Sequence, residues 1–178
     1  MLHGGVVALA QPRPVLRLDL RTAKDWAGDG RLLLMLDGVG NPHNLGAIAR
    51  SAAFFGVPRI VLSDHPAQAK PSDASYRVAE GGLEYVELYR CLHFAQKLRD
   101  LRASYRIVAA ATDKGQPISA LRRGKRPFAL ILGNEERGLP RATLEVCDEI
   151  ITIPGSGAVQ SLNVAATAAI FLYAIAAG

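Results

Sequence analysis

Glycine-rich loops with short polar side chains follow several short, largely apolar runs of the chain. These runs are typical of strands, and they span residues 32–36, 105–110, 128–132 and 149–153. In open α/β sheets, ligands bind beyond the carboxyl ends of the strands, and glycine lets backbone amides approach a ligand closely. Gly, Asn and Pro also favour ordinary turns. The recurrence of such loops after successive runs nevertheless favours a small-molecule site.

Two common nucleotide-binding motifs are excluded. The loop that begins at Gly155 has the first two glycines of GxGxxG, but Gln160 stands where the third would be. No acidic residue follows Gln160 to bind a ribose, and too little chain remains for a further βαβ unit. The sequence also has no GxxxxGK[ST] motif, which excludes a P-loop.

Four polar residues in or beside predicted helices are candidates for a site. Asn44 lies where an N-cap would lie, and Arg50 points away from the apolar face of the helix predicted over 44–55. Ser161 could simply cap the last helix. Asn163 stands in an otherwise apolar helix, where an amide without a partner costs about 1–3 kcal/mol. We therefore expect Asn163 to face a site or a subunit interface.

Composition predicts one globular domain with a preference for anions. The chain has 178 residues, 49% of them hydrophobic, and a net charge of +5, which makes nucleic acid a plausible partner. Strand-like runs, with two more at 59–63 and 83–88, alternate with helical patterns. The helices are predicted at 44–55, 71–80, 92–103, 118–122 and 161–177. This alternation predicts an α/β fold, a mostly parallel sheet flanked by helices.

The cysteines and the apolar segments indicate where the protein is located and whether it binds a metal ion. Cys91 and Cys147 are far apart and form no CxxC, so we expect reduced thiols in a cytoplasmic protein and no metal site. No signal-peptide pattern is visible at residues 1–30. The most apolar segment, 162–177, is shorter than the ~20 residues of a membrane span, so we expect no membrane association.

Three segments, in order, resemble the SpoU (TrmH-like) family of the SPOUT class of RNA methyltransferases. The first is DGVGNPHNLGAIARSAAFFGV at 37–57, with Asn44 and Arg50 at N-x5-R spacing. The second is ILGNEERGLP at 131–140, and the third is IPGSGAVQSLNVAATAAIFLY at 153–173. Each motif alone is weak, but the three at these separations are specific, and the resemblance spans most of residues 30–175.

The resemblance implies a fold and an activity. Family members transfer a methyl group from S-adenosylmethionine to a ribose 2′-hydroxyl of tRNA or rRNA, releasing S-adenosylhomocysteine. Their C-terminal part forms a deep trefoil knot, a rare exception among folds, and they are homodimers. Residues 31–178 would be this catalytic domain. Residues 1–30 would be an arm or linker. On the hypothesis that the chain is a fragment, they would be the possible remnant of the N-terminal RNA-binding domain that many members carry.

The resemblance also implies the site residues. The catalytic candidates are Asn44, Arg50, Glu135, Ser161 and Asn163. The cofactor-binding candidates are Thr112, Leu132, Gly133, Ile153, Gly157 and Leu162. Arg50 would act near the cofactor of the partner subunit, either as a base or by gripping an RNA phosphate.

The sequence departs from the family pattern at two positions, and other interpretations of the function are open. Gly155 replaces a common Met, and Gln160 replaces a common acidic residue, so substrate fit is in question. A catalytically silent relative that binds RNA or a ribosome-assembly partner is the main alternative, and a base-methylating enzyme is less favoured. A basic stretch, Arg122, Arg123, Lys125 and Arg126, could contact phosphate or be a solvated loop.

Overall fold

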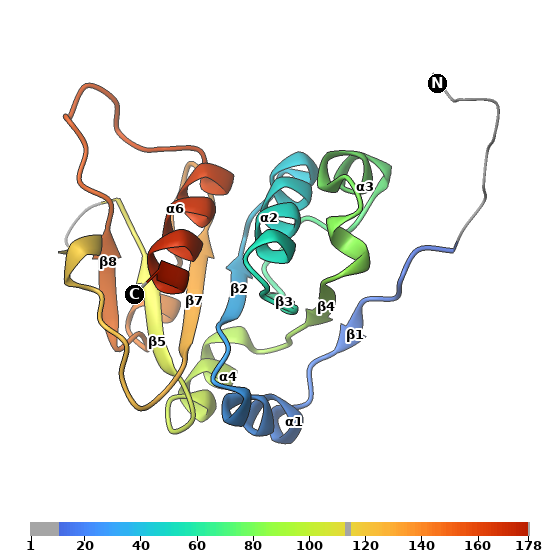
Figure 1. The fold of residues 1–178 in the computed structure, drawn as a ribbon, viewed down its shortest axis with the longest axis horizontal. Helices are drawn as coiled ribbons and strands as arrows, with labels where there is room; N and C mark the ends of the chain where they lie inside the picture. Colours follow the sequence, from blue (N-terminus) through green and yellow to red (C-terminus); the bar gives the residue numbers. More distant parts are fainter. Residues whose placement is uncertain (1–10, 113–114, 178) are drawn as a thin grey trace.

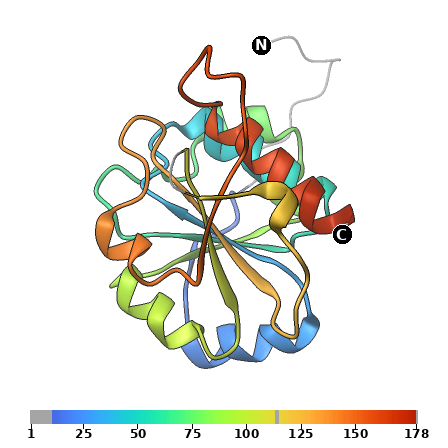
Figure 2. The ribbon, with the colours of Figure 1, turned by 90° about the vertical axis from the view of Figure 1, so that its left-hand side faces the viewer.

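The structure is a computed structural model that describes residues 11–112 and 115–177, and it is a sheet with helices on both faces (Figures 1 and 2). Within that range the strands are all parallel, in the order β1-β4-β3-β2-β7-β5-β8-β6. Their bounds are β1 Leu16–Arg17, β2 Leu33–Asp37, β3 Arg59–Leu62, β4 Glu87–Arg90, β5 Arg106–Ala110, β6 Gln116–Pro117, β7 Phe128–Gly133 and β8 Glu149–Thr152. The predicted α/β fold with a mostly parallel sheet is confirmed.

Helices connect these strands. The α-helices are α1 Leu20–Asp25, α2 Pro42–Phe54, α3 Asp73–Ala79, α4 Phe94–Leu101, α5 Arg141–Leu144 and α6 Val164–Ala177. Short 3-10 helices are η1 Trp26–Asp29, η2 Gly82–Glu84 and η3 Ile118–Ala120. None of the helices in the described ranges is long and apolar enough to cross a membrane.

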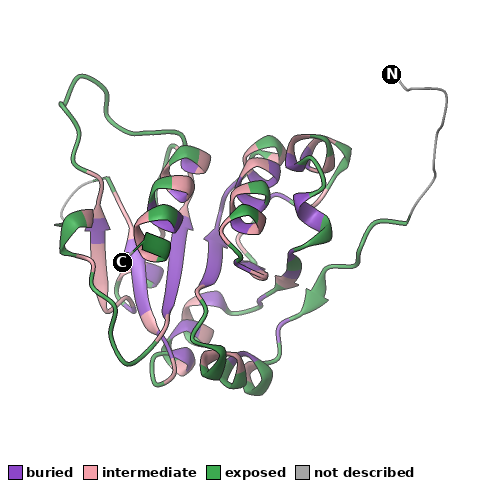
Figure 3. Ribbon diagram, in the orientation of Figure 1, coloured by how far each residue is buried: buried purple, intermediate pink, exposed green. Residues whose placement is uncertain are grey.

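The central strands are buried on both faces, which explains their continuous apolar runs. All five residues of β2 are buried, as are the first five of β7. One face of the sheet is covered by α2, α3 and α6 and the other by α1, α4 and α5, with the core between the layers (Figures 2 and 3). Residues 16–30 lie against the second face, where Leu18 and Ala23 are buried.

The order of the strands places the end of β7 beside the loop that precedes α2. β7 lies between β2 and β5, so Leu36 is opposite Leu132 and Asp37 is opposite Gly133. Chain segments that are far apart in sequence therefore end side by side at the carboxyl edge of the sheet. This edge is where an open parallel sheet binds its ligands.

The caps of two helices differ from the prediction. Asn41, not Asn44, is the N-cap of α2, and its side chain accepts a hydrogen bond from the His43 backbone N–H at 2.9 Å. Pro42 starts the helix, so Asn44 is left free for other contacts. Ser161 does not cap α6 either. The side-chain oxygen of Asn163 accepts a hydrogen bond from the Ala165 backbone N–H at 2.8 Å and so caps that helix.

Two predicted elements differ from the structure, and one lies outside it. The strand expected at 83–88 is wrong over its first four residues, because Gly81 at φ 85° begins the η2 turn, and β4 starts at Glu87. The helix expected at 118–122 is only the short η3. The strand-like segment at residues 3–8 lies outside the described residues.

Candidate active site

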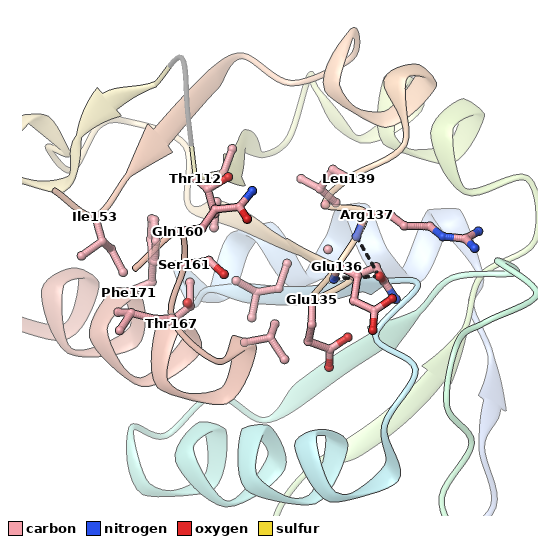
Figure 4. A pocket seen from close by; sticks show the side chains of 18 of the residues that line it. Thr112, Glu135, Glu136, Arg137, Leu139, Ile153, Gln160, Ser161, Thr167 and Phe171 are labelled. Atoms are coloured by element: carbon pink, nitrogen blue, oxygen red, sulfur yellow. Dashed lines mark hydrogen bonds between the residues drawn. The ribbon is translucent and has the colours of Figure 1, made fainter. Parts of the chain in front are cut away.

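A cavity of about 620 Å³ opens at the carboxyl ends of β5, β7 and β8. Its walls are the residues that follow these strands, together with residues 160–162 and the first turns of α6. Figure 4 shows Glu135 and Glu136 of the loop after β7 on one side, and Ile153, Ser161 and Thr167 on the other. The volume lies within the ~300–1,000 Å³ of small-molecule sites.

Gly133 allows the loop after β7 to fold back on itself. A Cβ atom at this position would lie 2.7 Å from the backbone carbon of Gly138 and 2.8 Å from Cγ of Leu139. The turn is closed by two backbone hydrogen bonds between Asn134 and Gly138, of 3.1 and 2.9 Å. Gly138 adopts a φ of 68°, which side chains disfavour. The cavity wall at this place therefore depends on two glycines.

The Asn134 side chain joins this turn to the loop that precedes α2. Its oxygen accepts hydrogen bonds from the backbone N–H groups of Glu136 and Arg137, both at 3.0 Å. Its nitrogen donates to the Gly38 carbonyl oxygen at 2.9 Å. One amide thus fixes the shape of the turn and its distance from the end of β2.

Three of the predicted catalytic residues contact one another, although they come from three separate segments, and one of them, Glu135, lines the cavity. The Asn44 amide nitrogen of α2 donates a hydrogen bond to the Glu135 carboxylate after β7. The Asn163 amide nitrogen donates to the Asn44 side-chain oxygen at 3.1 Å. Asn44 is therefore used as both donor and acceptor, and it links the loop after β7 and the start of α6 to α2.

Ser161 and Arg50, the other two catalytic candidates, lie in different places. Ser161 lines the cavity. Arg50 is on the exposed side of α2, as the helical periodicity predicts, and does not line the cavity. Its guanidinium lies 2.9 Å from the Glu80 carboxylate, and their side chains are 57% and 63% exposed. A single chain does not bring Arg50 to the cavity.

Most of the predicted cofactor-binding residues line the cavity. These are Thr112, Leu132, Gly133, Ile153 and Leu162. Gly157 is not among the lining residues and lies in the exposed loop that precedes α6. Neighbours in the cavity wall that the sequence did not single out include Phe171 and Thr167, which α6 places there.

Gln68 is a structural residue of the site that the sequence did not indicate. Its side-chain oxygen accepts hydrogen bonds from the backbone N–H groups of Gly38 and Val39, at 3.0 and 3.2 Å. Its amide nitrogen donates to the carbonyls of Val39 and Ala69, at 3.1 and 3.3 Å. The loop that carries α2 is thus held from both sides, by Gln68 and by Asn134. Gln68 belongs to no motif, so its role appears only in three dimensions.

The two cysteines are unsuited to chemistry at neutral pH. Burial raises the pKa of Cys91 to about 12, and the Asp64 carboxylate adds to the effect. Burial likewise raises the pKa of Cys147 to about 12, together with Asp148. Both thiols therefore stay protonated. Residues 11–112 and 115–177 contain no group of three or more His, Cys, Asp or Glu placed to hold a metal ion.

Fold and cavity together define an α/β protein with a ligand-sized cavity at the carboxyl edge of a parallel sheet. The model of the SpoU rRNA methylase family matches residues 31–173. The chain belongs to this family, as its motifs predict.

Three curated relatives are 36–39% identical to this chain over the aligned residues. One is the 23S rRNA (guanosine-2′-O-)-methyltransferase RlmB of Acinetobacter baylyi, 36% identical over 96% of this chain and 69% of its own length. Another is RlmB of Haemophilus influenzae, 38% identical over 98% and 71%. RlmB of Nitrosomonas europaea is 39% identical over 80% of this chain, but only 54% of its own length is covered.

Solved structures share the fold. The TrmH/SpoU tRNA modifying enzyme of A. aeolicus has a TM-score of 0.73 and 27% identity, with 89% of this chain and 83% of that chain covered. The SpoU methyltransferase AviRb of Streptomyces viridochromogenes, in complex with the cofactor AdoMet, also has a TM-score of 0.73. The two chains are 26% identical, and the match covers 83% of this chain and 57% of AviRb.

Proposed function

We propose that this chain is the catalytic domain of an enzyme that transfers a methyl group from S-adenosylmethionine to a ribose 2′-hydroxyl of tRNA or rRNA. The observation that carries the proposal is the contact of Asn44 and Asn163 with Glu135, which lines the cavity, through a chain of two hydrogen bonds. The relatives support it, because their names describe 2′-O-methylation of 23S rRNA. This function is our conclusion for residues 31–178, the domain that we assign to catalysis.

The cavity fits the cofactor in size and chemistry. Leu132, Ile153 and Leu162 offer apolar contacts to the ligand. The carboxylates of Glu135 and Glu136 suit a ligand that carries a sulfonium and an ammonium group. We assign Thr112, Leu132, Gly133, Ile153, Gly157 and Leu162 to binding it. When bound, S-adenosylmethionine supplies a methyl group that is already activated for transfer.

The work of the protein residues is then mainly positioning. A hydroxyl must be held in line with the activated methyl group, and fixed geometry lowers the barrier of such a step. Asn44 keeps the Glu135 carboxylate in place, and Asn163 fixes Asn44. Ser161 adds a hydroxyl from the opposite wall. Arg50, whose guanidinium stays charged, is suited to a bidentate grip on the phosphate beside the target ribose.

Arg50 can do this only if a second copy of the chain comes close, and we include a homodimer in the proposal. Phe54 is 83% exposed and Tyr173 is 65% exposed, and both stand next to the half-buried Phe55. Such an apolar patch is typical of an interface. Arg50 and Phe54 are four residues apart and share one face of α2. A partner that covers Phe54 would therefore meet Arg50.

Two further expectations belong to the same proposal. The C-terminal part forms the trefoil knot of the family; its support is the match of the family model to residues 31–173. The enzyme acts in the cytoplasm, where its RNA is found.

Calorimetry and one substitution test the proposal. We expect S-adenosylmethionine to bind wild-type protein with one site per chain. We expect Arg50→Lys to keep that affinity and lose most methyl transfer to unmodified rRNA, because a lysine cannot grip a phosphate bidentately. Full activity of Arg50→Lys would remove Arg50 from the mechanism. Cofactor binding without transfer by wild-type protein to any RNA would instead favour a catalytically silent relative.

A further inference from the structure

A second cavity lies at the opposite end of the sheet from the candidate active site. It also measures about 620 Å³, and it opens where β2 and β7 begin and where α2 and α6 end. We call it the basal cleft and define it by two sets of residues. Its floor includes Leu32, Phe55, Val57, Leu172 and Ile175, and its rim carries the cations Arg31, Arg123, Lys125 and Arg126.

The charge of the basal cleft has one sign. No acidic side chain is among its lining residues in the described chain. The acidic residue nearest in sequence to Arg31 is Asp29, which already pairs with Arg59 at 3.0 Å. In a protein with a net charge of +5, four cations around one concavity form a local site for an anion.

The four cations are not equivalent. Arg126 is occupied, since it donates to the Tyr105 carbonyl at 3.1 Å and lies 4.0 Å from Asp148. Arg123 donates to the carbonyls of Ile175 and Ala176 at the end of α6, at 2.9 and 3.3 Å. It thereby neutralises the negative end of the helix, which would otherwise repel an anion.

Arg31 and Lys125 are the two cations free to bind a ligand. Across the parts of the chain that the structure describes, neither side chain makes a hydrogen bond or an ion pair, and both residues are exposed. They precede neighbouring parallel strands, in which Leu33 is opposite Ala129. Both cations therefore enter the cleft from the same end of the sheet, beside an apolar floor.

We propose that the basal cleft binds the phosphate backbone of a single-stranded RNA segment. This inference rests on the proposed function, because it adds a second contact with the substrate RNA. Cations with no acidic side chain among the lining residues of the cleft suit a strand of charged phosphates. β7 runs from the cleft, at Phe128, to the candidate active site, at Gly133, a distance of about 17 Å. RNA that reaches both sites must pass over the helices that cover β7, so more than about five nucleotides separate the two contacts.

Charge reversal at matched positions tests the proposal. One variant is Arg31→Glu with Lys125→Glu, in the cleft. The control is Lys97→Glu with Arg99→Glu on α4, which lies on the other face of the sheet and undergoes the same change in charge. The probe is a fluorescein-labelled uridine 20-mer, whose affinity is measured by fluorescence anisotropy over a range of salt concentrations.

We expect the cleft variant to bind the probe on the order of tenfold more weakly and to lose about 1.4 from the slope of log affinity against log salt. The control should change less than about threefold. Equal losses in both variants, or no loss in the cleft variant, would overturn the proposal. Loss of binding to a polyglutamate peptide, with binding of the RNA unchanged, would overturn it in favour of an acidic protein partner.

Two further measurements keep the result interpretable. Arg31→Gln with Lys125→Gln is a milder variant for the case that charge reversal impairs folding, and it should weaken RNA binding in the same direction. Titration of S-adenosylmethionine into each variant reports on the active-site cavity separately. If the cleft variants bind both the cofactor and the RNA normally, the proposed role of the cleft in RNA binding is overturned, and the proposed function is not affected. If wild-type protein does not bind the cofactor, the proposed function is contradicted, and the role of the cleft is not affected.

Discussion

Replacing Gly133 by alanine tests whether the turn after β7 forms the cofactor site. The new Cβ atom would lie 2.7 Å from the Gly138 backbone carbon, whereas ordinary contacts begin at 3.4 Å. Gly138 must therefore move by about 0.7 Å. That movement strains the two hydrogen bonds between Asn134 and Gly138 and distorts the cavity wall.

Overpacking of this kind costs about 1–3 kcal/mol of folding stability. If about the same free energy is lost from cofactor binding, the affinity for S-adenosylmethionine falls roughly 5- to 150-fold. Calorimetry measures the affinity and urea unfolding measures the stability, both at a temperature at which circular dichroism reports a folded protein.

Gly28→Ala is the matched control for Gly133→Ala. It adds the same methyl group where no atom lies within 4 Å, and Gly28 does not need a left-handed backbone. We expect its cofactor affinity and its stability to match those of wild type within error. Wild-type affinity in Gly133→Ala, despite the expected loss of stability, would refute the placement of the cofactor against this turn.

Three other predictions follow from contacts described above. Gln68→Ala leaves the backbone N–H groups of Gly38 and Val39 without an acceptor, so urea unfolding should show that the protein is less stable by about 1–3 kcal/mol. The rate of methyl transfer should fall by a larger factor than the affinity for the cofactor. An unchanged rate would show that Gln68 does not position α2. Phe54→Asp should convert a dimer to a monomer in light scattering and abolish methyl transfer, and an active monomer would contradict the proposed role of a second chain. Folding stability should fall as the pH rises from about 9 toward 12. Cys91 and Cys147 have pKa values of about 12 in the folded protein and ordinary values of 9.0 in the unfolded chain, so only the unfolded chain loses these protons in that range. Equal urea midpoints at about pH 7.5 and 10.5 would argue against buried thiols.

The centre of the sheet could be predicted from sequence because its central strands are buried on both faces. A strand covered on both sides must be apolar throughout, so the runs at 32–36 and 128–132 stand out and correspond to β2 and β7. The order of the strands could not be predicted in this way. Apolar periodicity indicates which segments are strands, but it does not indicate that β7 inserts between β2 and β5.

Short elements and irregular turns escaped prediction for a related reason. α1 and α5 are only six and four residues long, too short for a helical period to emerge. The weak alternation at 83–88 is interrupted by the η2 turn, which the left-handed conformation of Gly81 initiates. In these places tertiary packing decides the backbone, and no local pattern records it.

The candidate site was predicted in part, through its motifs. The structure brings together Asn44, Glu135 and Asn163, which are distant in sequence. It does not bring Arg50 to the same cavity, because Arg50 lies on the exposed face of α2 and pairs with Glu80. The supporting side chain Gln68 belongs to no motif and contacts only backbone groups. Such residues are found only once the loops have been placed in space.

Transfer of a labelled methyl group to RNA tests the central claim most directly. The protein would be incubated with S-adenosylmethionine that carries a deuterated methyl group and with unmodified rRNA and tRNA transcripts. The RNA would then be digested to nucleosides for mass spectrometry. Our account predicts a nucleoside with the deuterated methyl on its ribose 2′-oxygen. A label on a base, or no label in RNA when the cofactor is bound, would contradict it.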